Sequence, residues 1–283
     1  MNKQERIQKY FNQKEKLSLD NLKYLGQLKA LTDFWLQEDL GEEGDITSNL
    51  MIKDNMEATA EIVAKEDGVV AGIEEVKWLC GAIVVESVND GSVVKKGDVL
   101  CKLQAPIKDI LKLERTILNL LQRMSGIATQ TANLFKETKG KVLVCPTRKT
   151  QWGLLDKKAV TVGGGGTHRL GLYDFILIKE NHLKASSDFQ PPESFWEIEV
   201  ESIEQARQMA KLNPGAMMFD DFTPDDIKKA IQQIDGGIIF EASGGIDQNN
   251  IQDYINTGVD IISLGSLTHS TKALDIGLYI SNP

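Results

Sequence analysis

Residues 197–220 have the sequence EIEVESIEQARQMAKLNPGAMMFD, which contains a complete strand–helix–strand unit. Glu197 to Val200 and Ala216 to Phe219 have the length and apolar content of buried strands. Ile203 to Leu212, between them, has its apolar residues at helical spacing. Strands joined through a helix lie parallel in one sheet, so this stretch predicts an α/β fold with a parallel sheet.

The same unit recurs through the second half of the chain. Further strands are predicted at residues 142–145, 175–178, 238–242 and 259–264, and helical patterns at 227–234 and 251–255 separate several of them. This number of units favours an α/β barrel over a short open sheet.

The first half of the chain has a different pattern. Apolar residues recur at helical spacing from Leu17 to Leu40, and short β-type runs with glycine turns follow up to Lys102, predicting a small, mostly antiparallel β unit. Residues 90–100, DGSVVKKGDVL, resemble the hammerhead of biotinyl and lipoyl carrier domains. The Met-Lys pair that is modified in carriers is absent, so a structural β-sandwich is favoured.

Composition limits the function. The chain has 283 residues, 41% of them hydrophobic, and a net charge of -9, which argues against a general nucleic-acid surface because phosphate binding needs a basic field. No apolar run approaches the roughly 20 residues of a membrane span. The three cysteines form no metal-binding motif. We therefore expect a cytoplasmic protein with reduced thiols and no membrane segment.

Charged residues follow several predicted strands. Lys179 follows one strand, Glu199 lies at the end of the next, and Asp220 follows the third. The next two strands end in Ser243-Gly244-Gly245 and Gly265-Ser266, whose backbone amides can bind an anion. Ligands bind at the carboxyl ends of parallel strands, so these residues predict one site.

Two basic motifs, Thr147-Arg148-Lys149-Thr150 and Thr167-His168-Arg169, strengthen this prediction. Either motif alone is typical of a solvated surface. Together with the carboxylates and the glycine cradle they predict a site for a polyanion, with acids for a metal or sugar hydroxyls, and phosphoribosyl pyrophosphate has these components.

Other reactive residue types have simpler explanations. Gly163 to Gly166 fit a flexible turn as well as a ligand loop. Cys145 is expected to be a buried thiol, His182 a capping or indirectly placed histidine, and His269 a loop histidine. A Cys–His nucleophile is not favoured, because the sequence does not bring such residues together.

A set of ordered motifs resembles the quinolinate phosphoribosyltransferase family over nearly the whole chain. The motifs are EDLG (38–41), GDITS (44–48), ERT (114–116) with Asn119, SGIAT (125–129), TRKT (147–150), HR (168–169), GLYD (171–174), IKENH (178–182), EIEVE (197–201), EASGGI (241–246) and GVDIISLG (258–265).

The resemblance implies an N-terminal α/β sandwich domain at residues 1–117, onto which the tail 275–283 packs back, and an open, incomplete α/β barrel at 118–274. It implies a homodimer, or a higher oligomer, whose sites are completed across the interface. Its site residues would be Arg115 from the neighbour, Arg148, His168 and Arg169 for the substrate carboxylates; Lys149, Lys179, Glu199 and Asp220 as catalytic groups; and Ser243, Gly244, Gly245, Gly265 and Ser266 for phosphate.

The implied reaction joins quinolinate to phosphoribosyl pyrophosphate, giving nicotinate mononucleotide, pyrophosphate and CO2 in NAD synthesis. Mg²⁺ is the implied cofactor, held by Glu199 and Asp220 with the substrate. Pro146 and Thr167 stand where the family usually has Asp and Asn, which keeps open a relative that acts on another pyridine or acid. A non-catalytic binding relative is the alternative from another class, because fold does not fix function.

Overall fold

The computed structural model describes residues 1–186, 189–234 and 236–281. The chain divides into two compact units. The first unit comprises Met1–Lys14, Asn133–Thr150 and Gly164–Ser270, and the second comprises Glu15–Ala132, Gln151–Gly163 and the residues from Thr271 onward.

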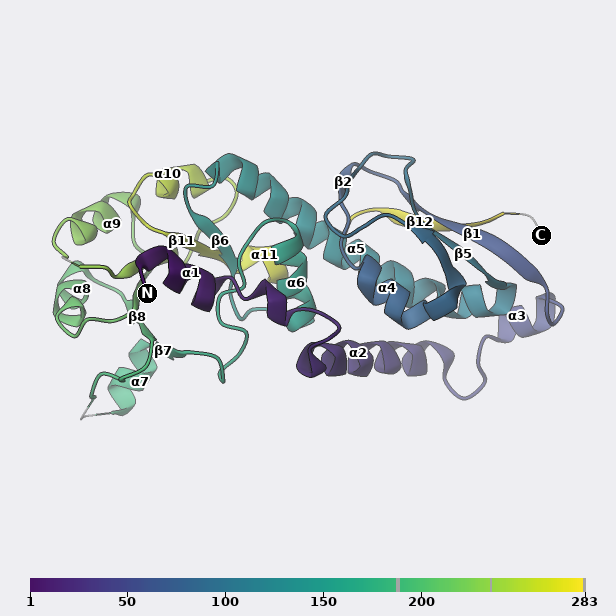
Figure 1. Ribbon diagram of the computed structural model, residues 1–283, viewed down its shortest axis with the longest axis horizontal. Helices are drawn as coiled ribbons and strands as arrows, with labels where there is room; N and C mark the ends of the chain where they lie inside the picture. Colours follow the sequence, from purple (N-terminus) through teal and green to yellow (C-terminus); the bar gives the residue numbers. More distant parts are fainter. Residues whose placement is uncertain (187–188, 235, 282–283) are drawn as a thin grey trace. The chain divides into compact units, whose positions relative to one another are not determined.

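The first unit is built on a parallel sheet with strand order β6-β11-β10-β9-β8-β7, visible in Figure 1. The strands are β6 (Leu143–Pro146), β7 (Ile176–Ile178), β8 (Trp196–Val200), β9 (Ala216–Asp220), β10 (Ile239–Ser243) and β11 (Ile261–Leu264). The helices between them are α7 (Glu180–Ala185), α8 (Ile203–Ala210), α9 (Pro224–Ile231), α10 (Ile251–Ile255) and α11 (Ser266–His269).

The predicted fold class is confirmed. All six predicted strands form, each within two residues of its predicted bounds. β6 and β7 stand at the two ends of the strand order and are not paired with each other in the described chain, so the barrel is open. The wholly buried patterns of β8 and β11 explain why these strands are continuous apolar runs: a parallel sheet is covered on both faces.

An N-terminal helix, α1 (Lys3–Phe11), also belongs to the first unit. The Asn2 side chain and the Glu5 side chain cap its first turn reciprocally, as a capping box. Ile7 and Phe11, one helical turn apart, are buried in the same core as Cys145. This helix was not predicted from the sequence, because the polar residues around these apolar positions dominate the segment.

The second unit contains an antiparallel sheet of order β12-β1-β5-β3 and a two-stranded sheet of β2 and β4. Its strands are β1 (Glu57–Ala64), β2 (Gly68–Val69), β3 (Val84–Ser87), β4 (Val93–Val94), β5 (Val99–Pro106) and β12 (Ile276–Ser281). Its helices are α2 (Leu22–Leu40), α3 (Ile46–Met51), α4 (Ile73–Cys80), α6 (Leu154–Val162), the larger part of α5 (Ile107–Thr138), and the short 3-10 turns η1 (Lys14–Lys16) and η2 (Gly81–Ile83).

The tail of the chain pairs with β1 through β12, from Ala64 opposite Ile276 to Thr59 opposite Ser281. The domain boundary predicted between residues 117 and 118 falls inside α5, a continuous helix of 32 residues. Residues 1–14 belong to the barrel unit, because Ile7 and Phe11 pack in its core. The predicted division itself stays a prediction.

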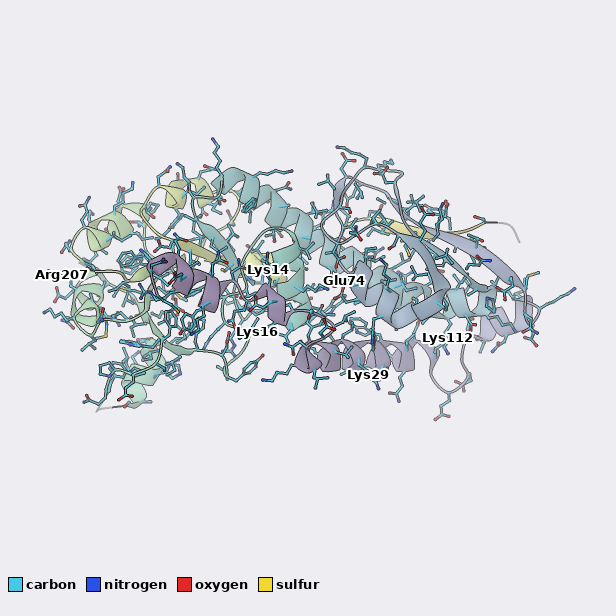
Figure 2. All side chains as sticks on the ribbon, in the orientation of Figure 1. Lys14, Lys16, Lys29, Glu74, Lys112 and Arg207 are labelled. Atoms are coloured by element: carbon cyan, nitrogen blue, oxygen red, sulfur yellow. The ribbon has the colours of Figure 1, made fainter. Side chains whose placement is uncertain are left out.

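Charged side chains occur on helices of both units. Figure 2 labels Lys29 on α2, Glu74 on α4 and Arg207 on α8 among them. None of the helices in the described chain combines the length and apolar character that crossing a bilayer requires.

Candidate active site

A cavity of about 540 Å³ opens at the carboxyl ends of the parallel strands in the first unit. Every predicted site residue except Arg115 lines it: Arg148, Lys149, His168, Arg169, Lys179, Glu199, Asp220, Ser243, Gly244, Gly245, Gly265 and Ser266. The strand-end rule therefore places these residues together, as the sequence predicted.

The charged groups on one side of the cavity come from three neighbouring strands. Lys179 follows β7 and is the N-cap of α7, Glu199 lies in β8, and Asp220 ends β9. β7 pairs with β8 and β8 pairs with β9, so these side chains share one rim. The Lys179 ammonium is ion-paired with the Glu199 carboxylate.

The negative charge of Asp220 has less positive charge beside it than that of Glu199, which is ion-paired with Lys179. Partial burial and the charge of Asp221 raise the pKa of Asp220 above its ordinary value, although Lys179 and Lys149 oppose the shift. A carboxylate in this setting is stabilised by any further cation that binds beside it.

The loops after β10 and β11 contain the residues that were predicted to bind phosphate, and these residues line the cavity. Gly244 and Gly245 have φ angles of 86° and 59°, in the left-handed region. A Cβ at Gly244 would overlap the backbone and side chain of Asp221, so only glycine fits there.

Lys149 is held beside these loops. The Thr268 hydroxyl donates to the Lys149 carbonyl (2.9 Å), and the Lys149 amide donates to Thr147 Oγ (3.1 Å). A Cβ on Gly265 would lie 3.3 Å from the Lys149 side chain and 3.0 Å from the His269 ring. The Lys149 and His269 side chains therefore both lie beside Gly265.

Arg169 and Arg148 bring two guanidinium groups to the same cavity. Arg169 is 5% exposed, and burial, followed by the positive charge of Arg148, lowers the pKa of Arg169. Arginine remains charged in proteins even so, and two guanidinium groups at one cavity favour a ligand with more than one carboxylate.

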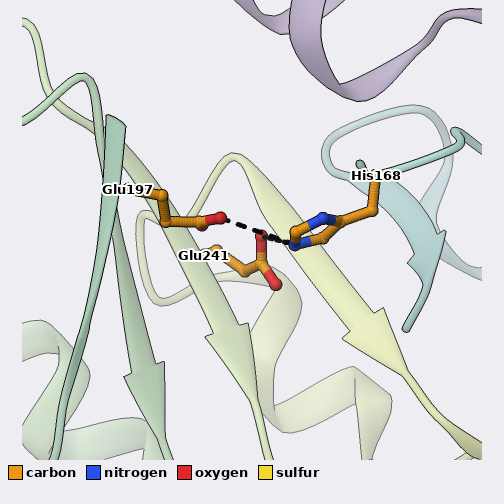
Figure 3. Close-up of side chains that lie close together, drawn as sticks. All are labelled: His168, Glu197 and Glu241. Atoms are coloured by element: carbon orange, nitrogen blue, oxygen red, sulfur yellow. Dashed lines mark ion pairs between the residues drawn. The ribbon is translucent and has the colours of Figure 1, made fainter. Parts of the chain in front are cut away.

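A buried cluster lies beneath the cavity and was not predicted. His168 Nε2 lies 3.2 Å from Glu241 Oε2 and 3.6 Å from Glu197 Oε2 (Figure 3). Both carboxyl groups are completely inaccessible. Glu197 and Glu241 stand in the motifs EIEVE and EASGGI. Alternation within a strand indicates only that each points to the same face as the residues two positions away, not that the two glutamates meet.

The two carboxyl groups differ in pKa. Burial, followed by the charge of Glu241, raises the pKa of Glu197 well above its ordinary value. Burial also opposes ionisation of Glu241, but contact with His168 and the Ser263 hydroxyl outweighs it and lowers the pKa of Glu241. The two groups thus behave as a pair in which Glu241 keeps the charge.

The remaining expectations have mixed outcomes. His182 is a capping histidine, since its Nδ1 accepts the Lys179 amide (3.0 Å), and Cys145 is a buried thiol. His269 lies in α11 and lines the cavity, so it is not an isolated loop residue. None of the glycines 163–166 is among the cavity-lining residues; Gly166 instead packs against Phe11 and Cys145.

Arg115 is exposed on α5 and is not among the residues that line this cavity in its own chain. The cavity also includes residues that were not predicted: Thr147, Leu177, Met218, Ile246, Asp247, Ser263 and His269. Leu177, Met218 and Ser263 are inward-facing strand residues without a distinctive sequence pattern.

Comparison with known proteins agrees with this geometry. The family model described as quinolinate phosphoribosyl transferase, N-terminal domain, matches residues 45–125, and the model for the C-terminal domain matches residues 127–279. The chain belongs to the quinolinate phosphoribosyl transferase family. Together the two family models cover the antiparallel sheet, the long helix α5 and all six strands of the barrel.

Relatives of this family match most of the chain. It is 38% identical over 273 residues to the probable nicotinate-nucleotide pyrophosphorylase [carboxylating] of Bacillus subtilis, covering 90% of this chain and 94% of that protein. It is 38% identical to the Mycobacterium leprae nicotinate-nucleotide pyrophosphorylase [carboxylating], covering 86% and 93%. The structure of the Francisella tularensis nicotinate-nucleotide pyrophosphorylase superposes with a TM-score of 0.83 at 32% identity, covering 90% and 96%.

Proposed function

We propose that this chain is a quinolinate phosphoribosyltransferase. It transfers the phosphoribosyl group of phosphoribosyl pyrophosphate to the ring nitrogen of quinolinate, with loss of pyrophosphate and CO2, to give nicotinate mononucleotide for NAD synthesis. The observation that carries the proposal is the meeting of four lysine and arginine side chains, three carboxylates and glycine-containing strand-end loops in one cavity. Relatives that share over a third of its residues along most of the chain have names that state this activity.

Arg148 and Arg169 bind the two carboxylates of quinolinate in this proposal. Guanidinium groups suit planar carboxylates because each can donate two parallel hydrogen bonds. Arg115 would complete this end of the site from the second subunit of a homodimer. Fixing both carboxylates orients the ring nitrogen toward the sugar.

Phosphoribosyl pyrophosphate occupies the other end. Ser243 to Gly245 and Gly265 to Ser266 bind its 5-phosphate through backbone amides. Lys149 and Lys179 stabilise the departing pyrophosphate while positive charge develops at the anomeric carbon, and Glu199 and Asp220 bind the ribose hydroxyls. Stabilising charge as it develops is usually the largest catalytic term.

The same two acids fit a magnesium ion. Both offer hard oxygen ligands at one rim, and the raised pKa of Asp220 indicates a carboxylate that lacks sufficient positive charge. When bound with the substrate, Mg²⁺ would supply positive charge to the pyrophosphate oxygens.

The ring nitrogen attacks the anomeric carbon as the bond to pyrophosphate breaks. The ribosylated ring then loses its 2-carboxylate as CO2; the electron pair left on the ring carbon is stabilised by the adjacent positive nitrogen and takes up a proton. The chain therefore needs no organic cofactor for decarboxylation. We propose a cytoplasmic location and dimeric assembly for this enzyme.

The test is product formation by the purified chain. With quinolinate, phosphoribosyl pyrophosphate and Mg²⁺ we expect nicotinate mononucleotide, detected by chromatography and mass. Nicotinate in place of quinolinate should give little product, because one missing carboxylate leaves a guanidinium group of the cavity without its ligand partner. Equal turnover of the two acids would refute the assignment of quinolinate.

A further inference from the structure

A chain of contacts runs beneath the cavity from β11 to the loop that carries Arg169. The Ser263 hydroxyl on β11 donates to Glu241 Oε1 on β10 (2.6 Å). The other carboxylate oxygen, Oε2, lies 3.2 Å from His168 Nε2. The backbone amide of Arg169 donates to His168 Nδ1 (2.7 Å).

These contacts fix where the imidazole hydrogen lies. Nδ1 accepts a hydrogen bond from an amide, so it carries no hydrogen itself, and the ring hydrogen is at Nε2. Nε2 lies 3.2 Å from Glu241 Oε2, so the edge of the ring that carries the hydrogen faces that carboxylate. Figure 3 shows the imidazole edge pointing at the two acids rather than away from them.

The rest of the loop leaves His168 little freedom. Its φ of 49° is in the left-handed region, and its amide donates to the Phe11 carbonyl (3.2 Å). The rings of Phe11 and Phe175 contact the imidazole, with centroid distances of 5.2 Å and 5.6 Å. Because the Phe11 and Phe175 rings restrict the imidazole, the position of its Nδ1 determines the orientation of the Arg169 amide that donates to it.

We propose that Glu241, held by Ser263, is a positioning residue for the dicarboxylate end of the cavity. It sets the hydrogen position of His168, and His168 fixes the backbone from which Arg169 enters the cavity. The inference rests on the proposed function, and it gives roles to Glu241 and Ser263 that lie outside the binding groups named above.

A metal ion is the competing explanation for this cluster. His168, Glu197 and Glu241 each offer a ligand atom, all within 4.8 Å of one another. A metal at Nε2 would displace the hydrogen from that nitrogen while Nδ1 also lacks one, which would require a doubly deprotonated ring. A neutral ring with its hydrogen at Nε2 needs no such species and is favoured.

The kinetic test compares substitutions of the acceptor. Glu241→Leu should raise the KM for quinolinate at least about tenfold and change the KM for phosphoribosyl pyrophosphate by less than about twofold. Glu241→Gln should recover most of the loss, because its carbonyl can accept from His168 and its amide can donate to Ser263. Ser263→Ala should have an intermediate effect.

Glu75→Gln is the matched control, because Glu75 is an equally buried carboxyl group in the second unit. Its quinolinate KM should equal that of the unsubstituted protein even where its melting temperature falls. An unchanged quinolinate KM in Glu241→Leu, or equal rises for both substrates, would overturn the inference. If Glu241→Leu does not fold, the quinolinate KM values of Glu241→Gln and Ser263→Ala decide the question instead.

Nitrogen-15 NMR of the histidine rings tests the inference without turnover. The chain has three histidines, so the His168 resonances can be assigned by substitution. We expect the Nε2-hydrogen tautomer in the unsubstituted protein and its loss in Glu241→Leu. The other tautomer, or replacement of the Nε2 hydrogen signal on tight stoichiometric binding of Zn²⁺, would refute the inference. Inactivity of the unsubstituted protein would refute the proposed function alone.

Discussion

Lys149 and Lys179 reach the cavity from different strand ends, and each faces a different neighbour. Lys149 lies beside Gly265, whereas Lys179 is ion-paired with Glu199. An ammonium group is a compact charge with freely rotating donors, which suits the many oxygens of a pyrophosphate.

Replacing either lysine by Met should therefore lower kcat at least about tenfold, or about 1.4 kcal/mol of transition-state stabilisation. Met retains the length of the side chain and removes the charge. Steady-state kinetics and circular dichroism on the two variants check this outcome. Lys29→Met, an exposed lysine on α2, is the control, and near-normal activity in Lys149→Met or Lys179→Met would remove that lysine from the catalytic set.

Asp90 is a partly buried carboxyl group far in sequence from these residues. It lies 3.7 Å from Lys158 Nζ, and its Oδ1 accepts the Ile73 amide (2.8 Å). Burial, followed by the charge of Glu75, nevertheless raises the pKa of Asp90 to about 6 from 3.8. Between these values the folded protein binds the proton and the unfolded chain does not, so this group destabilises the fold as pH rises through the window.

The free energy of unfolding of Asp90→Asn, relative to that of the unsubstituted protein, should therefore increase between pH 4 and pH 7, by up to about 3 kcal/mol. Asn retains the oxygen that accepts from Ile73. Urea unfolding across this pH range measures the difference. Asp67→Asn gives the opposite sign, because hydrogen bonds from Lys95 and Lys96 lower the pKa of exposed Asp67. A difference for Asp90→Asn that does not vary with pH would show that Asp90 is ionised throughout.

At the scale of elements, the parallel strands decide which charges meet. Glu199 on β8 pairs in register with Met218, and Asp220 lies two residues further along β9, at its end. Side chains two residues apart in a strand point to the same face. Both carboxylates therefore project toward the cavity from adjacent strands.

We expect Glu199→Ala and Asp220→Ala to raise the KM for phosphoribosyl pyrophosphate more than the KM for quinolinate. The reason is that these acids are assigned to the sugar hydroxyls and the metal, not to the pyridine ring. Initial-rate kinetics with each substrate varied in turn distinguishes the two constants. The reverse ordering would place the sugar at the other end of the cavity.

The strands and most of the cavity could be predicted because their patterns are local. Apolar runs alternate with helical periodicity, and each strand is followed by the charged or small residue that enters the cavity. Glu197 and Glu241 could not be predicted, because their proximity to His168 depends on how three elements pack. α1 was missed although Ile7, Tyr10 and Phe11 have helical spacing and Asn2 and Glu5 form a capping box, since the segment is polar on average.

At the scale of the whole molecule, one predicted site residue remains apart from the cavity of its own chain. Arg115 lies on α5, off the buried stripe formed by Ile117, Leu120 and Leu121. The homodimer proposed above gives this exposed guanidinium group a function in the neighbouring cavity.

Mixing two inactive variants tests that function. Arg115→Ala and Lys149→Ala homodimers should each be nearly inactive, because every site lacks one group. In a mixed dimer one site carries both defects and the other carries none. Subunit exchange should therefore restore up to about a quarter of the unsubstituted activity, since about half of the dimers are mixed and each has one intact site. Tagged subunits report the exchange. If exchange is complete and activity does not return, Arg115 acts only as a surface residue of its own chain.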